Sequence, residues 1–189
     1  MSDAIAVSTR ERILAAAKAE FARYGAAGAR INRIASEAQT SKDRLYAHFA
    51  GKEELYRAVT EQWCAQAAQD AAMTAEDIPG YVGQLYDHFL KNPDNARLQA
   101  WAELESLDND LARETLQRYA AGKVAELRRG QRDGMIDEVW PPMGLMIMLT
   151  DVARTAALHT RQTSARGAKR AENRRLAILA ATRLVTPQR

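Results

Sequence analysis

Apolar residues recur at intervals of three and four along almost the whole chain, which is the period of an amphipathic helix. The clearest stripe predicts a helix over about residues 9–24 and consists of Ile13, Leu14, Ala17, Phe21 and Tyr24. Ser8 and Glu11 match a capping box at its start, and Gly25 suits the left-handed backbone of a helix end. No stretch alternates convincingly with period two. We therefore expect an all-α fold of about nine helices, without internal repeats.

The other helices are predicted from the same pattern and from prolines and glycines that end helices. Two short helices are expected over about residues 30–38 and 40–49, followed by a long fourth helix from residue 51 or 52 to about 73. Beyond Asp77 five more are expected, over about residues 79–90, 94–107, 109–132, 141–160 and 169–184. Three short helices thus lead into a long one.

Composition is that of an ordinary folded protein, with 189 residues of which 47% are hydrophobic and 27% charged. The longest apolar stretch, residues 143–149, is far shorter than the ~20 residues of a membrane helix, and no signal segment opens the chain. We expect no membrane partner and a cytoplasmic location. The single cysteine, Cys64, cannot form an internal disulfide, and no Cys/His cluster accompanies it. No metal or other cofactor is implied.

The net charge of +3 is too small to indicate a nucleic-acid partner by itself. From Arg161 to the C-terminus, eight Lys or Arg residues face one acid, Glu172. Such a tail could be a nucleic-acid arm, but Leu176, Leu179 and Leu184 are interleaved with the charges at helical spacing. We favour the solvated face of a helix.

Residues 31–49 have the layout of a helix-turn-helix, in which two short amphipathic helices are joined by a tight turn. Leu45 and Phe49 lie four residues apart and are expected to face the core. The remaining side chains of the second helix suit a phosphate-lined groove. Arg44 and Lys42 can donate to guanine acceptors. Hydroxyl groups of Thr40, Ser41 and Tyr46 can bond phosphate oxygens, and Lys52 adds charge at the start of the next helix.

At these positions the chain resembles the TetR family of bacterial repressors. The resemblance lies in four segments: Phe21-Ala22-Arg23-Tyr24-Gly25, Ile34-Ala35-Ser36-Glu37-Ala38, Ser41-Lys42-Asp43-Arg44-Leu45-Tyr46-Ala47-His48-Phe49 and Lys52-Glu53-Glu54-Leu55. It implies a DNA-binding domain over residues 1–50 and a helical ligand-binding and dimerisation domain over residues 51–189, connected through the long fourth helix. It also implies that DNA contacts fall on Ser41, Lys42, Arg44, Tyr46, His48 and Lys52.

Three departures from the family pattern concern the DNA-binding surface. Gln39 and Thr40 replace the usual Gly-Val of the turn, so we expect a left-handed backbone at Gln39. Asp43 stands where glycine is common, and its carboxylate could repel phosphate or accept from a cytosine amine. Ala29 and Arg30 replace the usual capping hydroxyl residues, which removes a cap of ~1 kcal/mol. Arg30 is then a further candidate phosphate contact.

Aromatic and apolar residues of the second domain are the candidates for a ligand pocket. They are Trp63, Leu85, Phe89, Trp101, Leu104 and Tyr119. Each of them could equally be an ordinary core residue, and Cys64 could line a pocket, sense oxidants or simply be a small buried hydrophobe. Glu103 and Glu105 near Trp101 could attract a cationic ligand, or they could be solvent-exposed acids.

The last two predicted helices are apolar enough for a helix-on-helix dimer interface. Its candidate residues are Met146, Leu149, Val152, Leu176 and Leu179. The alternative, which we favour less, is that the methionines of the eighth helix line a cofactor-binding site.

Together these features predict a ligand-responsive transcriptional regulator, a homodimer that binds a pseudo-palindromic operator in double-stranded DNA and is released by a small-molecule effector. The rival is a small helical enzyme or ligand carrier. No nucleophile elbow, phosphate-binding glycine loop or metal-spaced histidine pair supports an enzyme. We therefore predict that the protein is not an enzyme.

Overall fold

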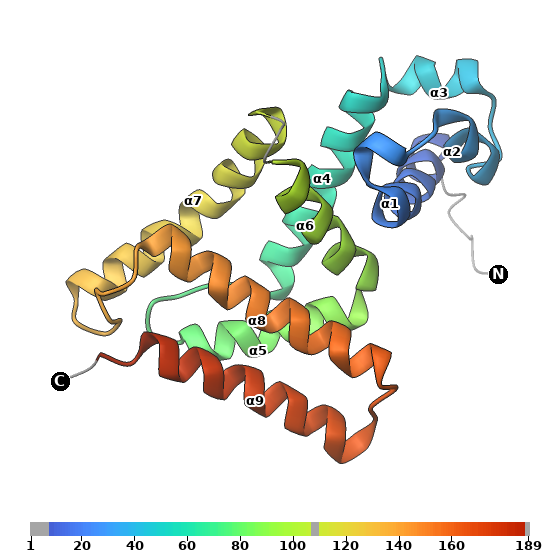
Figure 1. Cartoon of the computed structure of the whole chain (residues 1–189). Coiled ribbons are helices and arrows are strands. Elements are labelled where there is room, and N and C mark those ends of the chain that lie inside the picture. Colours follow the sequence, from blue (N-terminus) through green and yellow to red (C-terminus); the bar gives the residue numbers. More distant parts are fainter. Residues whose placement is uncertain (1–7, 107–109, 188–189) are drawn as a thin grey trace, which may run out of the picture.

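The computed structural model describes residues 8–106 and 110–187, which form nine α-helices and no strand (Figure 1). The all-α expectation is confirmed. The helices are α1 (Thr9–Gly28), α2 (Ile31–Glu37), α3 (Lys42–His48), α4 (Lys52–Asp70), α5 (Ile78–Lys91), α6 (Pro93–Glu105), α7 (Asp110–Arg132), α8 (Pro142–Gln162) and α9 (Gly167–Val185). The expected end of the sixth helix at residue 107 and start of the seventh at residue 109 lie outside the described residues.

The predicted capping box at the start of α1 is present. The Glu11 backbone N–H donates to Ser8 Oγ at 3.2 Å, and the Ser8 N–H donates to Glu11 Oε2 at 2.8 Å. Ser41 caps α3 by accepting from the Arg44 N–H at 3.1 Å. These local bonds satisfy amides that have no partner inside their own helix, which is why the helix starts follow from the sequence.

Gly25 interrupts α1 but does not end it. Its φ of +68° and ψ of 177° lie in a region that is essentially restricted to glycine, and one further helical turn runs on to Gly28. A Cβ atom at Gly25 would lie 2.8 Å from Cε3 of Trp101 in α6. The kink therefore lets α1 approach α6 closely, a contact that sequence reasoning did not anticipate.

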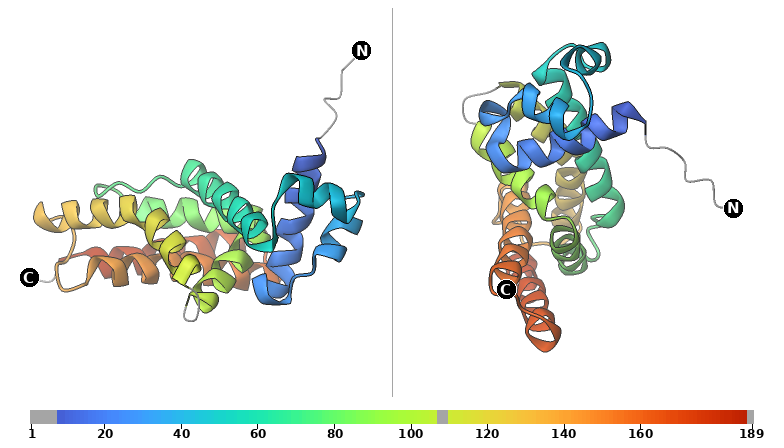
Figure 2. Two further views of the ribbon diagram at one scale, coloured as in Figure 1. Left: turned by 90° about the horizontal axis from the view of Figure 1, so that it is seen from above. Right: turned by 90° about the vertical axis from the view of Figure 1, so that its right-hand side faces the viewer.

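The molecule has two separate apolar cores. We call α1–α3 the head and α4–α9 the body; the views of Figure 2 place the head at one end of an elongated body. The first core lies within the head and includes Phe21, Ile34 and Leu45, but it extends past residue 50 to Leu55 and Trp63 of α4. The second core lies within the body. The N-terminal part of α4 thus stabilises the head.

Helix α5 is the centre of the body. It packs against α8 and α9, which also pack against each other, and it contacts α4 and α6 (Figure 1). One polar group inside this packing is His88, whose side chain is fully buried. Its Nδ1 lies 2.7 Å from Asp70 Oδ2 at the end of α4, and its Nε2 lies 3.0 Å from Asn95 Nδ2 in α6. This network ties three helices together.

Candidate nucleic-acid interface and ligand cavity

Helix α3 presents its polar side chains to solvent and buries one apolar residue. Leu45 is fully buried and Phe49, which follows the helix, is 2% exposed. The exposed side chains of α3 and its cap are Ser41, Lys42, Asp43, Arg44, Tyr46, Ala47 and His48. Because Leu45 and Phe49 fix the helix against the head core, these side chains have a rigid base. The predicted face of the helix-turn-helix is therefore assembled as the sequence suggested.

The turn between α2 and α3 contains the predicted left-handed residue. Gln39 has a φ of +52°, in a region that costs a residue with a Cβ about 1–2 kcal/mol. Thr40 differs from its predicted placement. Its Oγ1 is buried and has no hydrogen-bond partner in the described part of the chain, so in this structure the hydroxyl does not reach the surface where phosphate would lie. The tight turn folds this hydroxyl inward.

Arg30 and Lys52, the candidate phosphate contacts outside α3, differ in burial and in their contacts. Arg30 is exposed, and as expected α2 begins without a side-chain cap; instead the Arg30 N–H donates to Glu20 Oε1 at 2.9 Å. Lys52 is half-buried, and its Nζ lies 3.3 Å from the carbonyl oxygen of Ala27 and 3.5 Å from that of Ala29. The Lys52 ammonium therefore also ties the end of α1 to the start of α4.

One cation near α3 was missed from the sequence. Arg10, in the first turn of α1, places its guanidinium 5.2 Å from the centroid of the Phe49 ring. Arg10 is exposed, so this contact brings a further positive charge to the end of α3. In the sequence, Arg10 is simply a basic residue near the start of a helix. That position does not reveal that Arg10 lies beside the end of α3.

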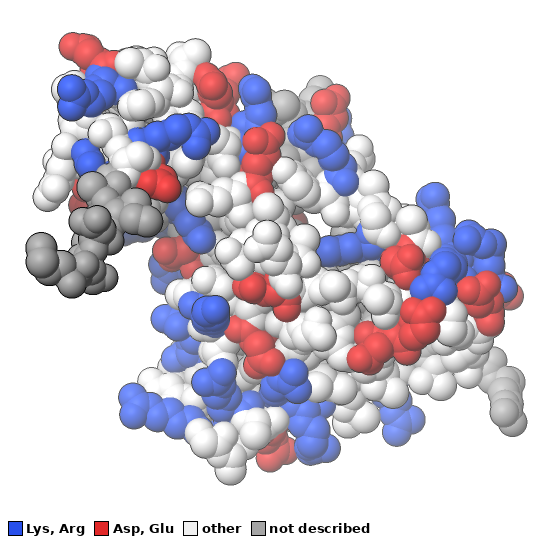
Figure 3. Space-filling model, turned by 180° about the vertical axis from the view of Figure 1, so that it is seen from behind, with Lys and Arg blue, Asp and Glu red and all other residues white. Residues whose placement is uncertain are grey.

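The basic C-terminal segment folds as helix α9, which packs on α5 and α8. Arg174 pairs with Asp87 at 2.7 Å, and Arg175 pairs with Glu172 at 3.3 Å. Lys and Arg side chains cover the lower part of the molecule in Figure 3 as well as the head, with acids interspersed. The ion pairs of Arg174 and Arg175 agree with a solvated helix face.

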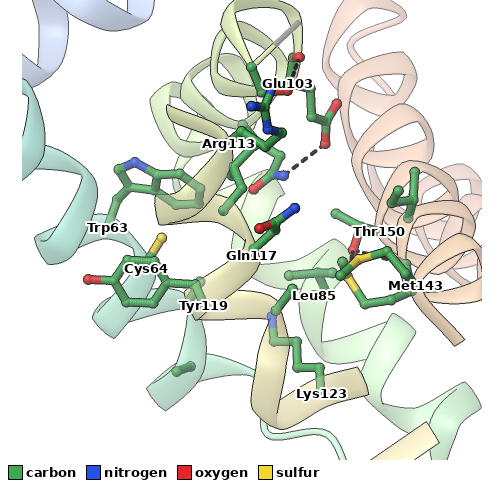
Figure 4. Close-up of a pocket in the computed structure, with 18 of the residues that line it drawn as sticks. Trp63, Cys64, Leu85, Glu103, Arg113, Gln117, Tyr119, Lys123, Met143 and Thr150 are labelled. Atoms are coloured by element: carbon green, nitrogen blue, oxygen red, sulfur yellow. Dashed lines mark hydrogen bonds between the residues drawn. The ribbon is translucent and has the colours of Figure 1, made fainter. Parts of the chain in front are cut away.

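A partly open cavity of about 420 Å³ lies in the body and is lined by side chains of α4, α5, α6, α7 and α8 (Figure 4). Four predicted pocket residues line it: Trp63, Leu85, Phe89 and Tyr119. The walls are largely aromatic and aliphatic, with Cys64 beside Trp63 and Met146 on the opposite helix. The volume lies within the range of ~300–1,000 Å³ that is typical of small-molecule sites.

Two predicted pocket residues lie elsewhere. Trp101 is half-buried against Gly25 at the junction with the head, and Leu104 is 60% exposed. Helix α6 instead turns Gln99 and Glu103, one helical turn apart, into the cavity. Since residues two positions apart point to nearly opposite sides of a helix, Trp101 faces away from the cavity that Gln99 and Glu103 line.

Glu103 is the acidic group of the cavity wall. Its Oε1 accepts from Gln99 Nε2 at 2.8 Å, and its Oε2 accepts from Arg154 Nη2 at 3.0 Å. Arg154 also pairs with Asp151. Burial raises the pKa of Glu103 above its ordinary value, although the Arg154 charge opposes this. Glu105 lies outside the cavity, and its Oε1 accepts from the Ala26 N–H of the head at 2.6 Å.

The predicted interface residues are divided between surface and interior. Leu176 and Leu179 of α9 are 46% and 42% exposed. On α8, Met146 lines the cavity, Val152 is half-buried and Leu149 is completely buried. Leu149 belongs to the inward stripe of α8, so in this structure its side chain cannot contact a partner.

A helix-turn-helix with an exposed polar second helix, placed at the end of a helical body with a largely apolar cavity, defines a class of DNA-binding regulator. Among the described residues no helix is long and apolar enough to cross a membrane. Nor do the described His, Cys, Asp and Glu residues gather into a group that could hold a metal ion.

Comparisons with known proteins agree with this class. The family of bacterial regulatory proteins named tetR matches residues 13–59, and the tetracyclin repressor-like C-terminal domain matches residues 77–183. The HTH-type transcriptional repressor SCO4008 of Streptomyces coelicolor is 38% identical over 152 residues, which cover 80% of this chain and 79% of that protein. The chain therefore belongs to the TetR family, as the sequence resemblance predicted, and is a DNA-binding transcriptional regulator.

Solved structures give the same result. The crystal structure of SCO4942 from Streptomyces coelicolor is 38% identical, with a TM-score of 0.76 over 94% of this chain and 98% of that one. A TetR family transcription regulator from Marinobacter aquaeolei has a TM-score of 0.78 over 95% and 96% of the two chains. At 20% identity the second likeness supports the fold alone.

Proposed function

We propose that the protein is a homodimeric repressor that places α3 of each copy in the major groove of a pseudo-palindromic operator and leaves it when a small molecule fills the cavity. The observation that supports this most directly is the exposed polar face of α3 above the buried Leu45. Two such helices fit half-sites about one DNA turn apart, ~34 Å.

Within this proposal the α3 side chains have separate roles. Arg44 and Lys42 read base edges by donating to guanine N7 and O6. Ser41, Tyr46, His48, Lys52 and Arg30 contact phosphates and set the register without reading sequence. Asp43 is exposed in the first turn of α3 and accepts from a cytosine amine.

Helix α6 is the proposed connection between cavity and operator. One of its faces supplies Gln99 and Glu103 to the cavity wall, while another holds the head through Trp101 against Gly25 and through Glu105 on the Ala26 N–H. A ligand that moves the first face must also move the second, because both belong to one rigid helix. Ligand affinity and operator affinity then oppose each other by thermodynamic linkage.

The proposed dimer uses the outer faces of α8 and α9. Leu176 and Leu179 on α9 are large apolar side chains that are 46% and 42% exposed, and Val152 on the neighbouring α8 is half-buried. Apolar side chains that remain exposed on such a helix favour a helix-on-helix interface between two copies.

Selection of binding sites from random duplex DNA, followed by mobility shifts, tests the proposal. We expect an enriched inverted repeat that the purified protein binds far more tightly than random DNA. Arg44→Ala should lose about 10–100-fold of that specific affinity, since a bidentate base contact contributes ~1–3 kcal/mol. Arg132→Ala, exposed at the end of α7, is the control. A selected pool that binds no better than random duplexes would refute the proposal.

A further inference from the structure

The cavity contains one cation whose charge is not balanced within the described part of the chain. Lys123 of α7 lines the cavity, and its side chain points inward, toward Leu85 and Gln117 (Figure 4). Its Nζ lies 5.3 Å from the centroid of the Tyr81 ring. None of the described carboxylates pairs with it. A half-buried ammonium against apolar walls is poorly solvated, so it favours an anionic partner.

The acidic group of the cavity is already compensated. Both carboxylate oxygens of Glu103 accept hydrogen bonds, one of them from the Arg154 guanidinium. Burial also raises the Glu103 pKa, which favours the uncharged form. A cationic ligand would have to compete with Arg154 for this carboxylate. The contacts of Glu103 therefore do not favour the cationic ligand that the sequence analysis considered.

The other ionisable groups of the wall do not supply the missing negative charge. Burial raises the pKa of the Cys64 thiol to about 12, so the thiol is uncharged at neutral pH. Arg113, which has an interaction of its own within the chain, adds positive charge to the wall. The charged side chains that line the cavity thus leave an excess of positive charge, located at Lys123.

We propose that the effector is an amphipathic anion, a molecule with one acidic group and an apolar body. Its acidic group pairs with Lys123 Nζ, and its body lies against Trp63, Phe89 and Tyr119. The inference rests on the proposed function, in which this cavity is the effector site. A cavity of about 420 Å³ has room for a ten-carbon chain or a two-ring aromatic body.

Probes with the same apolar body and a negative, neutral or positive head group test the proposal. The first series is decanoate, decanamide and decylamine, and the second is 2-naphthoate, 2-naphthamide and 2-naphthylmethylamine. Calorimetry on the full-length protein without DNA should show each carboxylate binding at least about tenfold tighter than its amide, the size expected of one charge-assisted hydrogen bond. The amines should bind weakest. Lys123→Gln should abolish the preference for carboxylate and leave amide binding unchanged.

Two control variants separate charge from structure. Lys123→Arg keeps a cation and should retain the preference for carboxylate, while Lys91→Gln removes an exposed lysine of α5 outside the cavity and should change nothing. The proposal is overturned if neither carboxylate binds better than its amide, if an amine binds tightest, or if Lys123→Gln retains the preference. Operator release is measured separately: a carboxylate that binds through Lys123 without releasing DNA would contradict the proposed function but not the ligand class.

Discussion

The head and the body hold their candidate sites in opposite ways. In the head, the polar side chains project outward from one seven-residue helix, α3, and the protein interior serves only to hold that helix in place. In the body, the site is a cavity between five helices, and each helix contributes a few side chains that lie far apart in the sequence. The surface of α3 depends on one local sequence pattern, whereas the cavity depends on how five helices pack.

This difference also governs how each region should respond to mutation. The head has a close-packed core in which Phe21 is fully buried, with its ring 5.1 Å from that of Tyr56. The body contains a partly open cavity, so side chains such as Met146 that border it make fewer contacts. Substitutions in the head core should therefore cost more stability than substitutions on the cavity wall.

Phe21→Ala should cause the largest loss, about 3–5 kcal/mol in the free energy of unfolding, because it leaves a hole that the head core cannot close. Met146→Ala on the cavity wall is the matched comparison and should cost about 2 kcal/mol or less. Urea denaturation followed by circular dichroism measures both. Equal losses would show that the cavity wall is packed as tightly as the head core.

Gly25→Ala tests the junction between the two regions. The alanine would adopt a backbone conformation that costs ~1–3 kcal/mol, and its Cβ would approach Cε3 of Trp101 to 2.8 Å. We expect a lower melting temperature and weaker coupling between effector and operator binding. Gly122→Ala, on α7 with open space around the new Cβ, should instead raise the free energy of unfolding by ~0.5–1 kcal/mol. A Gly25→Ala protein as stable as wild type would show that α1 adapts at this point.

Gln39→Gly should stabilise the head slightly. Glycine adopts the φ of +52° without strain, but it also gains entropy in the unfolded chain, so the net gain is about 0.5–1 kcal/mol. Thermal denaturation measures the gain. Operator affinity should stay within about twofold, because Gln39 precedes the exposed face of α3. A destabilised variant would indicate that the Gln39 side chain makes contacts that offset its backbone strain.

The smallest effect concerns pH and lies in the body. Burial lowers the pKa of His88 below its ordinary 6.5, although the hydrogen bond with Asp70 opposes the shift. The unfolded chain therefore binds a proton at a higher pH than the folded protein does. The free energy of unfolding should fall as the pH drops below 6.5 and level off once the folded protein is also protonated.

His88→Gln should remove this part of the pH dependence between pH 7 and 5. Urea denaturation of both proteins at several pH values gives the difference between their free energies of unfolding. Glu103, whose pKa is raised, contributes a pH dependence of the opposite sign, but it is present in both proteins and therefore cancels from the difference. A wild-type protein and a variant with the same pH profile would show that His88 does not titrate in this range.

The sequence was a good guide wherever neighbouring residues decide the outcome. The start of α1 follows from Ser8 and Glu11, and the exposed face of α3 follows from the spacing of Leu45 and Phe49. The left-handed Gln39 was predicted from the resemblance, because Gln39 occupies a turn position where the family usually has glycine.

Predictions that required the direction of a helix face were less successful. Trp101 and Leu104 were assigned to the pocket because they are large and apolar, but the rotation of α6 places Gln99 and Glu103 there instead. Leu149 was assigned to an interface and is buried, because α8 has apolar residues on both its inner and its outer faces. The sequence pattern alone does not distinguish an apolar face that meets the core from one that meets a partner.

Helix period, capping and turn motifs are properties of short segments, which is why the helices, the helix-turn-helix and the family could be predicted from the amino-acid sequence. The kink of α1 onto α6, the pairing of Glu103 with Arg154, and the position of Lys123 in the cavity, where no described carboxylate pairs with it, depend on how distant segments pack. Arg154 follows Glu103 by 51 residues, and Trp101 follows Gly25 by more than that. Charge balance and burial arise from such distant pairs, and packing alone brings them together.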